Sequence, residues 1–370
     1  MNFSLNEEQA LLKEAVERFA ASRYDLSRRA TYRASPSGYS AENWAALAEI
    51  GLLALPFAAE DGGLGGGPVE IMTVMEVLGR TLAVEPVLEE VVVAGGLVAR
   101  AGTRDQKDRW LPAIMDGSAH LTLAHFEHSA RFNLAGVRTQ VRHSARGAEL
   151  HGEKTLVPVG EAADAFIVSA RDDREGDGPG GIRLYLVAAD APGLKRRGFR
   201  LADGSAASSL RLDGAVGERL DGGYPDLSAA VQASQIAAGA EMLGIMSMLF
   251  DATLEYVRTR RQFGAVLGSF QVIQHRLVDL YVLLELSRSQ LYNAALCDGG
   301  EDERARAIAG MKSYLNSAAL TIGEHCIQLH GAMGTTDELP ISHGHKRLLV
   351  LATLFGDADS ELERYMRLTA

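Results

Sequence analysis

An apolar stretch without proline at residues 226–261, DLSAAVQASQIAAGAEMLGIMSMLFDATLEYVRTRR, constrains the fold more than any other feature. We expect one continuous helix here, because nothing in the stretch interrupts the helical repeat. Small residues dominate its first half, which suits close packing against other helices. Two more long helical patterns, at 270–296 and 303–331, and a shorter one near the end follow after short loops. We therefore predict a four-helix bundle at 223–370.

Residues 1–118 also show apolar side chains at helical spacing, and we predict an N-terminal helical domain there. Two pairs have the spacing of a capping box, Ser4 with Glu7 and Thr103 with Gln106. The glycines at 62–67 precede a helix that starts with Pro68. No parallel βαβ pattern surrounds these glycines, so they indicate a flexible loop rather than a dinucleotide fingerprint.

The residue pattern between the two helical parts is that of a sheet. LTLAHF, AFIVSAR and IRLYLVAAD are short strand-like runs, and the glycine-rich segment 176–181 is typical of a hairpin loop. The basic run 195–197 is predicted to be a solvated turn, with the phosphates of a ligand as an alternative neighbour. The fold class is therefore mostly α with a β insert, a small antiparallel β domain at 119–222 between the two helical domains.

Composition narrows the classes of partner. The 370 residues include 37 Lys+Arg and 48 Asp+Glu, a net charge of −11, which disfavours binding to nucleic acid or to an anionic membrane. Cys297 and Cys326 have neither metal-ligand nor disulfide-scaffold spacing. The first residues lack the basic region of a signal peptide, and no apolar run reaches the roughly 18 residues of a membrane span. We expect a cytoplasmic protein without membrane insertion and without a metal.

Two segments near helix ends could bind a ligand. Arg260 and Arg261 end the long helix, where guanidinium groups suit a pyrophosphate but also complement a helix dipole. The segment 328–334, QLHGAMG, places glycines where a ligand could approach the backbone, or where a helix simply ends. The residues alone leave both alternatives open.

Taken together, these features resemble the acyl-CoA dehydrogenase family over essentially the whole chain. The segment 328–334 is similar to one signature of the family. The other signature is similar to a stretch that contains Tyr256, Arg260, Gln262, Phe263, Gly264, Phe270, Gln271 and Gln274.

The resemblance implies an FAD that lies between subunits, with its pyrophosphate and adenine half held by a neighbouring chain. The corresponding positions here are Arg260, Gln262, Phe263, Gln271, Gln328 and Gly331. It also implies that a glutamate removes the α-proton of an acyl-CoA thioester, that FAD accepts a hydride, and that an electron-transfer flavoprotein takes the electrons.

Both positions where family members carry the catalytic base depart from the pattern. Phe355 takes the place of the glutamate near the C-terminus, and Gln232 takes the alternative place in the long helix. Neither side chain accepts a proton at neutral pH. Asp357 and Asp359 are the carboxylates that remain near the expected site, and Ala233 replaces an arginine that many members use near the thioester.

The segments that hold the flavin ring within a subunit also depart from the pattern. They are HFEHSARFNLAG at 125–136 and LeuValPro at 156–158, the latter after a well-matched Gly152-Glu153-Lys154. We expect a chain that holds its own flavin ring poorly and can still bind part of a partner's FAD.

This combination looks like the small subunits of heteromeric family members, such as that of pimeloyl-CoA dehydrogenase, whose larger subunit carries the glutamate. One alternative is a self-sufficient homo-oligomer, a dimer or tetramer, with an aspartate base. Another is a non-catalytic protein that binds an acyl-CoA or a partner.

Overall fold

The computed structural model describes residues 5–176 and 178–369. Its contacts group the chain into two compact units. The first unit comprises Met1–Thr31, Pro68–Ala83 and Gln235–Ala370, and the second comprises Tyr32–Gly67 and Val84–Ser234. This grouping joins helices from both ends of the chain, whereas the three-part division at 118 and 222 stays a prediction.

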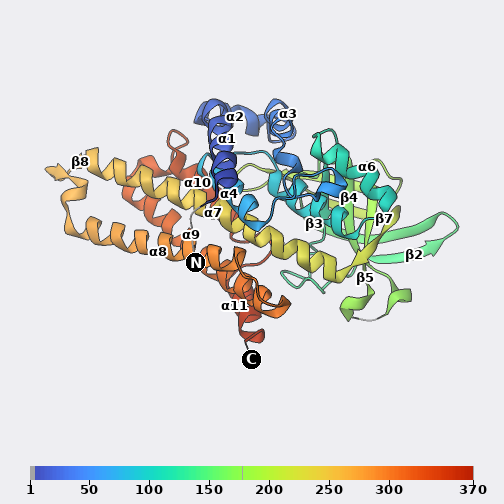
Figure 1. The fold of residues 1–370 in the computed structure, drawn as a ribbon. Coiled ribbons are helices and arrows are strands. Elements are labelled where there is room, and N and C mark those ends of the chain that lie inside the picture. The colour runs from blue at the N-terminus through green and yellow to red at the C-terminus, as the bar shows by residue number, and fades with distance from the viewer. Residues whose placement is uncertain (1–4, 177, 370) are drawn as a thin grey trace. The chain divides into compact units, whose positions relative to one another are not determined.

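The first unit is helical. It contains α1 (Glu7–Arg23), α4 (Pro68–Arg80), most of α7 (Tyr224–Thr259), α8 (Gln271–Ala295), α9 (Glu301–His330), α10 (Pro340–Leu351) and α11 (Ala358–Arg367). The long helix at 226–261 is confirmed as α7, and α8 packs against α9 (Figure 1). The single short closing helix is instead two, because Phe355 and Gly356 have φ values of 59° and 124° and interrupt the helical backbone.

Local capping explains where two helices begin. Thr103 and Gln106 form the predicted capping box at the start of α6 (Arg104–Met115). The first helix is capped differently. Ser4 lies outside the described residues, and Asn6 and Gln9 form a capping box that starts α1 at Glu7.

The second unit is built on a seven-stranded sheet with the order β1-β4-β2-β3-β7-β5, in which β6 pairs with β7. The strands are β1 (Leu121–Ala124), β2 (Gln140–Ser144), β3 (Gly147–Pro158), β4 (Ala165–Arg171), β5 (Ile182–Ala188), β6 (Leu194–Arg200) and β7 (Ala206–Gly223). The second unit also contains helices: α3 (Ala41–Glu49), the π-helix η3 (Val87–Gly95), α5 (Gly96–Ala101) and α6. The helix α2 (Leu26–Ala34) begins in the first unit and ends in the second. Buried Leu150, Phe166, Tyr185 and Leu212 form part of the core of the second unit.

Two details of the predicted sheet are wrong. The sheet is mixed rather than antiparallel, since β1 runs parallel to β4 over 121–124. The basic run 195–197 is not a turn but part of β6, which pairs with β7 along its length. This strand escaped prediction because it pairs with β7 alone and exposes charged side chains, so it lacks the apolar alternation of a half-buried strand.

Of the described residues, α7 alone is long and apolar enough to cross a membrane, contrary to the expectation that no segment reaches this threshold. In this structure 83% of its most apolar window is buried inside the protein, as in the core helix of a globular domain.

Two glycines bring the backbones of α4 and α7 together. A Cβ atom at Gly79 would lie 2.2 Å from the carbonyl oxygen of Glu241, and one at Gly244 would lie 2.0 Å from that of Glu76. Both contacts are with backbone atoms, so a larger side chain can be accommodated only if the helices move apart.

We therefore expect Gly244→Ala to lower the free energy of unfolding by about 1–3 kcal/mol, the usual cost of overpacking. Urea denaturation followed by circular dichroism measures this change. Gly96→Ala is the control, because its Cβ would meet nothing within 4 Å and alanine favours the helix by about 1 kcal/mol. Equal stability of Gly244→Ala and the wild type would show that the helices do not depend on this close approach.

Candidate functional site

The predicted ligand-binding residues from Arg260 to Gln271, which we call the hairpin corner, begin where α7 ends. Arg260 follows its last residue, and a tight hairpin of β8 (Arg261–Gln262) and β9 (Ala265–Val266) comes next (Figure 1). The two residues at the hairpin tip, Phe263 and Gly264, have φ values of 53° and 79°. Two positive values are the signature of a type I′ turn. The turn leaves the Phe263 side chain 87% exposed.

The two signature segments meet at this end of the bundle. Tyr256, one turn before Arg260, stacks on His330 with ring centroids 4.2 Å apart. Its hydroxyl donates a hydrogen bond to the His330 carbonyl. Gln328 and Gly331 lie near His330 in the sequence, so their backbone is at the same end of the bundle as the end of α7.

The polar groups of this corner are free. Within the described chain, the side chains of Arg260, Gln262, Gln271 and Gln328 are exposed and form no hydrogen bond or ion pair. One guanidinium and three amides thus offer donors to an anionic ligand, and Phe263 offers an apolar ring. Gly331 has φ 61°, a left-handed value that favours glycine, and a Cβ there would meet nothing within 4 Å.

Neither expected base position has a carboxylate. Phe355 is 6% exposed, with φ 59°, in the turn between α10 and α11. Three buried side chains donate hydrogen bonds to carbonyls of this turn: Gln235 to Phe355 at 2.7 Å, Asn316 to Gly356 at 3.0 Å and Lys312 to Leu351 at 2.6 Å. The unusual backbone is therefore held from several sides, as strained conformations require.

The other residues considered as the catalytic base or near the thioester either form hydrogen bonds within the chain or are exposed. Gln232 is half-buried and donates a hydrogen bond to the Ser228 hydroxyl, and Ala233 is exposed. Asp357 is the N-cap of α11 and accepts a hydrogen bond from the Ser360 amide at 2.8 Å. Asp359 is exposed in the first turn of the same helix.

A buried ion pair joins the departing segment 125–136 to Lys154, which lies just before the other departing segment, 156–158. The Lys154 ammonium is fully buried and lies 2.8 Å from Glu127, and it also donates to the Ser169 hydroxyl. Glu127 in turn accepts hydrogen bonds from the amides of Arg138 and Thr139 and from the Thr139 hydroxyl. The sequence does not predict this pair, because Glu127 is 27 positions from Lys154, and the matched Gly152-Glu153-Lys154 is the one signal for it.

Both partners of the pair have shifted pKa values. Burial lowers the pKa of Lys154 to about 8, although Glu127 opposes the change. Burial alone would raise the pKa of Glu127, but the Lys154 charge and the hydrogen bonds hold it below its ordinary value. The neighbouring segment 156–159 is also strained, since Leu156 and Val159 have φ values of 50° and 58°, and such values are rare for a β-branched residue.

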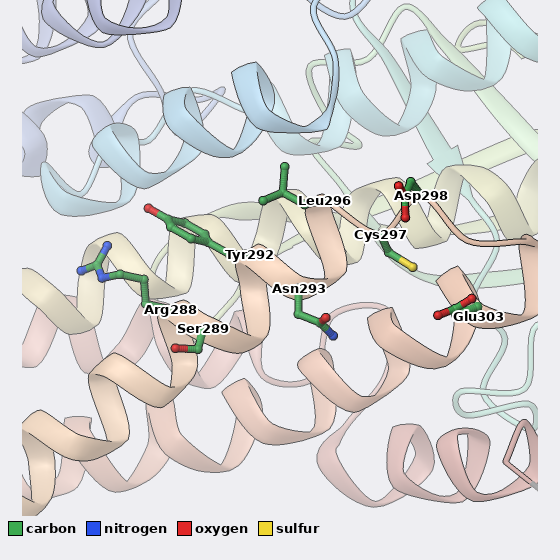
Figure 2. Close-up of a pocket in the computed structure, with 8 residues that line it drawn as sticks. All are labelled: Arg288, Ser289, Tyr292, Asn293, Leu296, Cys297, Asp298 and Glu303. Carbon is green, nitrogen blue, oxygen red and sulfur yellow. The ribbon is translucent and has the colours of Figure 1, made fainter. Parts of the chain in front are cut away.

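A separate cavity of about 440 Å³ lies at the other end of α8 (Figure 2). Its lining comes from the end of α8, the loop after it and the start of α9: Arg288, Ser289, Tyr292, Asn293, Leu296, Cys297, Asp298 and Glu303. The lining begins at Arg288, which is about 25 Å along α8 from Gln271 at a rise of 1.5 Å per residue, so the cavity is well separated from the hairpin corner. None of the predicted site residues lines it.

Comparison with known proteins identifies the family. Sequence models of the acyl-CoA dehydrogenase N-terminal and C-terminal domains match residues 6–118 and 221–367. Acyl-CoA dehydrogenase FadE27 of Mycobacterium tuberculosis is 28% identical over 339 residues, which cover 89% of this chain and 88% of the relative. The chain belongs to the acyl-CoA dehydrogenase family.

Solved structures agree over the full length. A variant of the Tcur3481-Tcur3483 steroid ACAD is 30% identical, with a TM-score of 0.89 and coverage of 99% of this chain and 98% of that chain. The ChsE4-ChsE5 complex from Mycobacterium tuberculosis is 27% identical, with a TM-score of 0.90 and the same coverage. The predicted fold class is confirmed: helical N- and C-terminal parts with a central β sheet.

Proposed function

We propose that this chain is a subunit of an FAD-dependent acyl-CoA dehydrogenase that oxidises the α,β-bond of an acyl-CoA thioester. In this proposal it works in a cytoplasmic hetero-oligomer with a larger subunit that carries the catalytic glutamate. The observation that carries the proposal is the combination of a free, donor-rich corner at Arg260 with a phenylalanine at the base position.

The donor set of the corner fits one half of FAD. A pyrophosphate accepts hydrogen bonds only, and Arg260 with the amides of Gln262, Gln271 and Gln328 supplies donors without internal partners. The exposed Phe263 ring suits contact with a flat base, and burial of an aromatic side chain is worth roughly 1.5–3 kcal/mol. The residues therefore fit the adenine and pyrophosphate half.

Bound FAD supplies the hydride acceptor, and an electron-transfer flavoprotein is the proposed next acceptor of the electrons. The residues of this chain would bind and orient the FAD. Arg260 would neutralise the charge of its pyrophosphate, and the hairpin would place the Phe263 ring against its adenine. Proton removal falls to the larger subunit, because Gln232 and Phe355 cannot accept a proton.

The relatives support an assembly of two different chains. Both solved structures above, Tcur3481-Tcur3483 and ChsE4-ChsE5, carry the names of two chains. We transfer this arrangement to the present chain as part of the proposal. Co-expression with its genomic neighbour, followed by native mass spectrometry, tests it. A complex of two chain types with acyl-CoA turnover supports the proposal, and turnover by a pure homo-oligomer contradicts it.

The competing proposal is a homo-oligomer with Asp357 or Asp359 as the base. Asp357→Asn separates the two, because asparagine caps a helix as well as aspartate does and cannot act as a base. We expect Asp357→Asn and Asp359→Asn to change acyl-CoA turnover of the purified assembly less than twofold. Loss of turnover by two or more orders of magnitude in either variant, with unchanged circular dichroism, would support an aspartate base.

A further inference from the structure

The π-helix η3 is an unusual element of the second unit. Such helices make up well under 1% of residues and often occur at functional sites. All nine residues of η3 are buried, including Glu89 and Glu90 in its interior. A buried carboxylate requires a compensating partner, so the contacts of Glu90 decide how stable this element is.

Among the described residues, the Glu90 side chain has one polar contact. Its Oε2 atom lies 2.8 Å from Nδ1 of His120, and the Oε1 atom is buried without a hydrogen-bond partner among the described residues. The exposed fractions of the two side chains are 2% for Glu90 and 21% for His120. Water thus reaches the pair from the histidine side.

His120 belongs to the sheet. It comes immediately before β1, its amide donates to Asp164 at 2.9 Å, and its carbonyl accepts the Asp164 amide at 2.8 Å. The rings of Tyr39 and Trp44 pack on it, with centroids 5.9 and 5.8 Å away. The imidazole is therefore held in place, and its contact with Glu90 connects η3 to the start of β1.

The charges around Glu90 are negative apart from His120. Glu89 and Asp164 both raise the pKa of Glu90, and the Tyr39 hydroxyl lies 3.2 Å from the imidazole Nδ1. Burial is the main cause that raises the pKa of Glu90 to about 7, against the opposing effect of His120. Burial alone would lower the pKa of His120, but the hydrogen bond and charge of Glu90 raise it above its ordinary value.

The raised pKa values of Glu90 and His120 change the stability of the folded state in the same direction as the pH rises. A group whose pKa is raised in the folded state binds its proton more tightly there than after local opening. The stability that Glu90 contributes is thus complete below its ordinary pKa of 4.5 and is lost as the pH rises to about 7. The contribution of His120 is lost as the pH rises through its own raised value.

We propose that the Glu90–His120 contact is a pH-sensitive interlock that holds η3 against β1 at acidic pH and loosens as the pH rises through neutrality. Strand β1 pairs with β4 alone, and η3 packs against it. The interlock therefore positions β1 and the segment 125–128 that follows it directly. This role does not depend on which ligand the protein binds.

Hydrogen exchange of the full-length protein, read by mass spectrometry and corrected for intrinsic rates, tests the interlock at about pH 5.5 and about pH 8. We expect the protection of amides in 87–95 and 119–124 to fall at least about tenfold at the higher pH, since one pKa unit is a tenfold change. Amides in β4 and β5 are the internal reference and keep their protection.

Glu90→Gln retains the shape of the side chain and removes its titration, so this variant should lose most of the pH dependence. Asp172→Asn is the matched control, because Asp172 is also buried and lies 2.8 Å from an imidazole, that of His143. It should keep the wild-type dependence. Equal protection of η3 in the wild type at both pH values overturns the proposal, and this measurement does not require Glu90→Gln to fold. A pH dependence in Glu90→Gln equal to that of the wild type also overturns it.

Discussion

Replacing Lys154 by methionine is expected to lower the free energy of unfolding by about 3–5 kcal/mol, the cost of breaking a buried ion pair on one side. Methionine replaces the four-carbon stem of lysine atom for atom and lacks only the ammonium, so the expected loss comes mainly from charge rather than from a cavity. Glu127 would keep its carboxylate 7% exposed without the ammonium that now lies 2.8 Å away. Urea denaturation followed by circular dichroism measures the loss.

The control is the double variant Lys154→Met/Glu127→Gln. Removal of both charges leaves no unpaired ion, and such replacements are often close to neutral. We expect it to recover at least half of the stability that the single variant loses. If Lys154→Met alone were as stable as the wild type, the ion pair would not hold the segments 125–139 and 152–158 together.

Arg260→Ala should weaken FAD binding by the co-purified assembly about ten- to hundredfold. Loss of a hydrogen bond to a charged group costs about 1.5–3 kcal/mol, and each 1.4 kcal/mol is tenfold in affinity. The Arg260 side chain is exposed and has no partner among the residues that the structure describes, so its removal should leave the fold unchanged. Flavin released during dialysis, followed by its absorbance, gives the change in affinity.

Arg261→Ala is the matched control for this prediction. Arg261 is the next residue and lies in β8, and its exposed side chain also has no partner within the described part of the chain. Both variants remove one positive charge from the same corner, and of these two arginines the proposed function assigns the phosphate contact to Arg260 alone. An equal drop in flavin affinity in both variants would show that the net positive charge of the corner, and not a specific contact of Arg260, holds the flavin.

The sequence predicts the helical parts well because their signals are local. The long helix needs only uninterrupted apolar spacing, and Thr103 with Gln106 needs only a four-residue pattern. The strand β6 and the parallel pairing of β1 depend on which segments become neighbours. Neither the charges of 195–197 nor the run LTLAHF contains that information.

In the candidate site, too, the sequence predicts the residues of a contiguous motif and not the contacts between distant segments. Arg260, Gln262 and Phe263 follow from a contiguous signature, and the structure adds that a type I′ turn exposes Phe263. The support of the Phe355 turn by Gln235, Asn316 and Lys312 joins residues more than 35 positions apart, so no spacing rule predicts it. No spacing rule predicts the contact between Glu90 and His120 either, because these residues are 30 positions apart in the sequence.

The central claim is that this chain binds part of an FAD whose ring belongs to a larger partner. Flavin absorbance of the chain purified alone, compared with that of the complex formed by co-expression with its genomic neighbour, tests it most directly. We expect the chain alone to be colourless and the complex to be yellow and to retain its flavin through gel filtration. Full flavin loading of the isolated chain, together with acyl-CoA turnover, would contradict it.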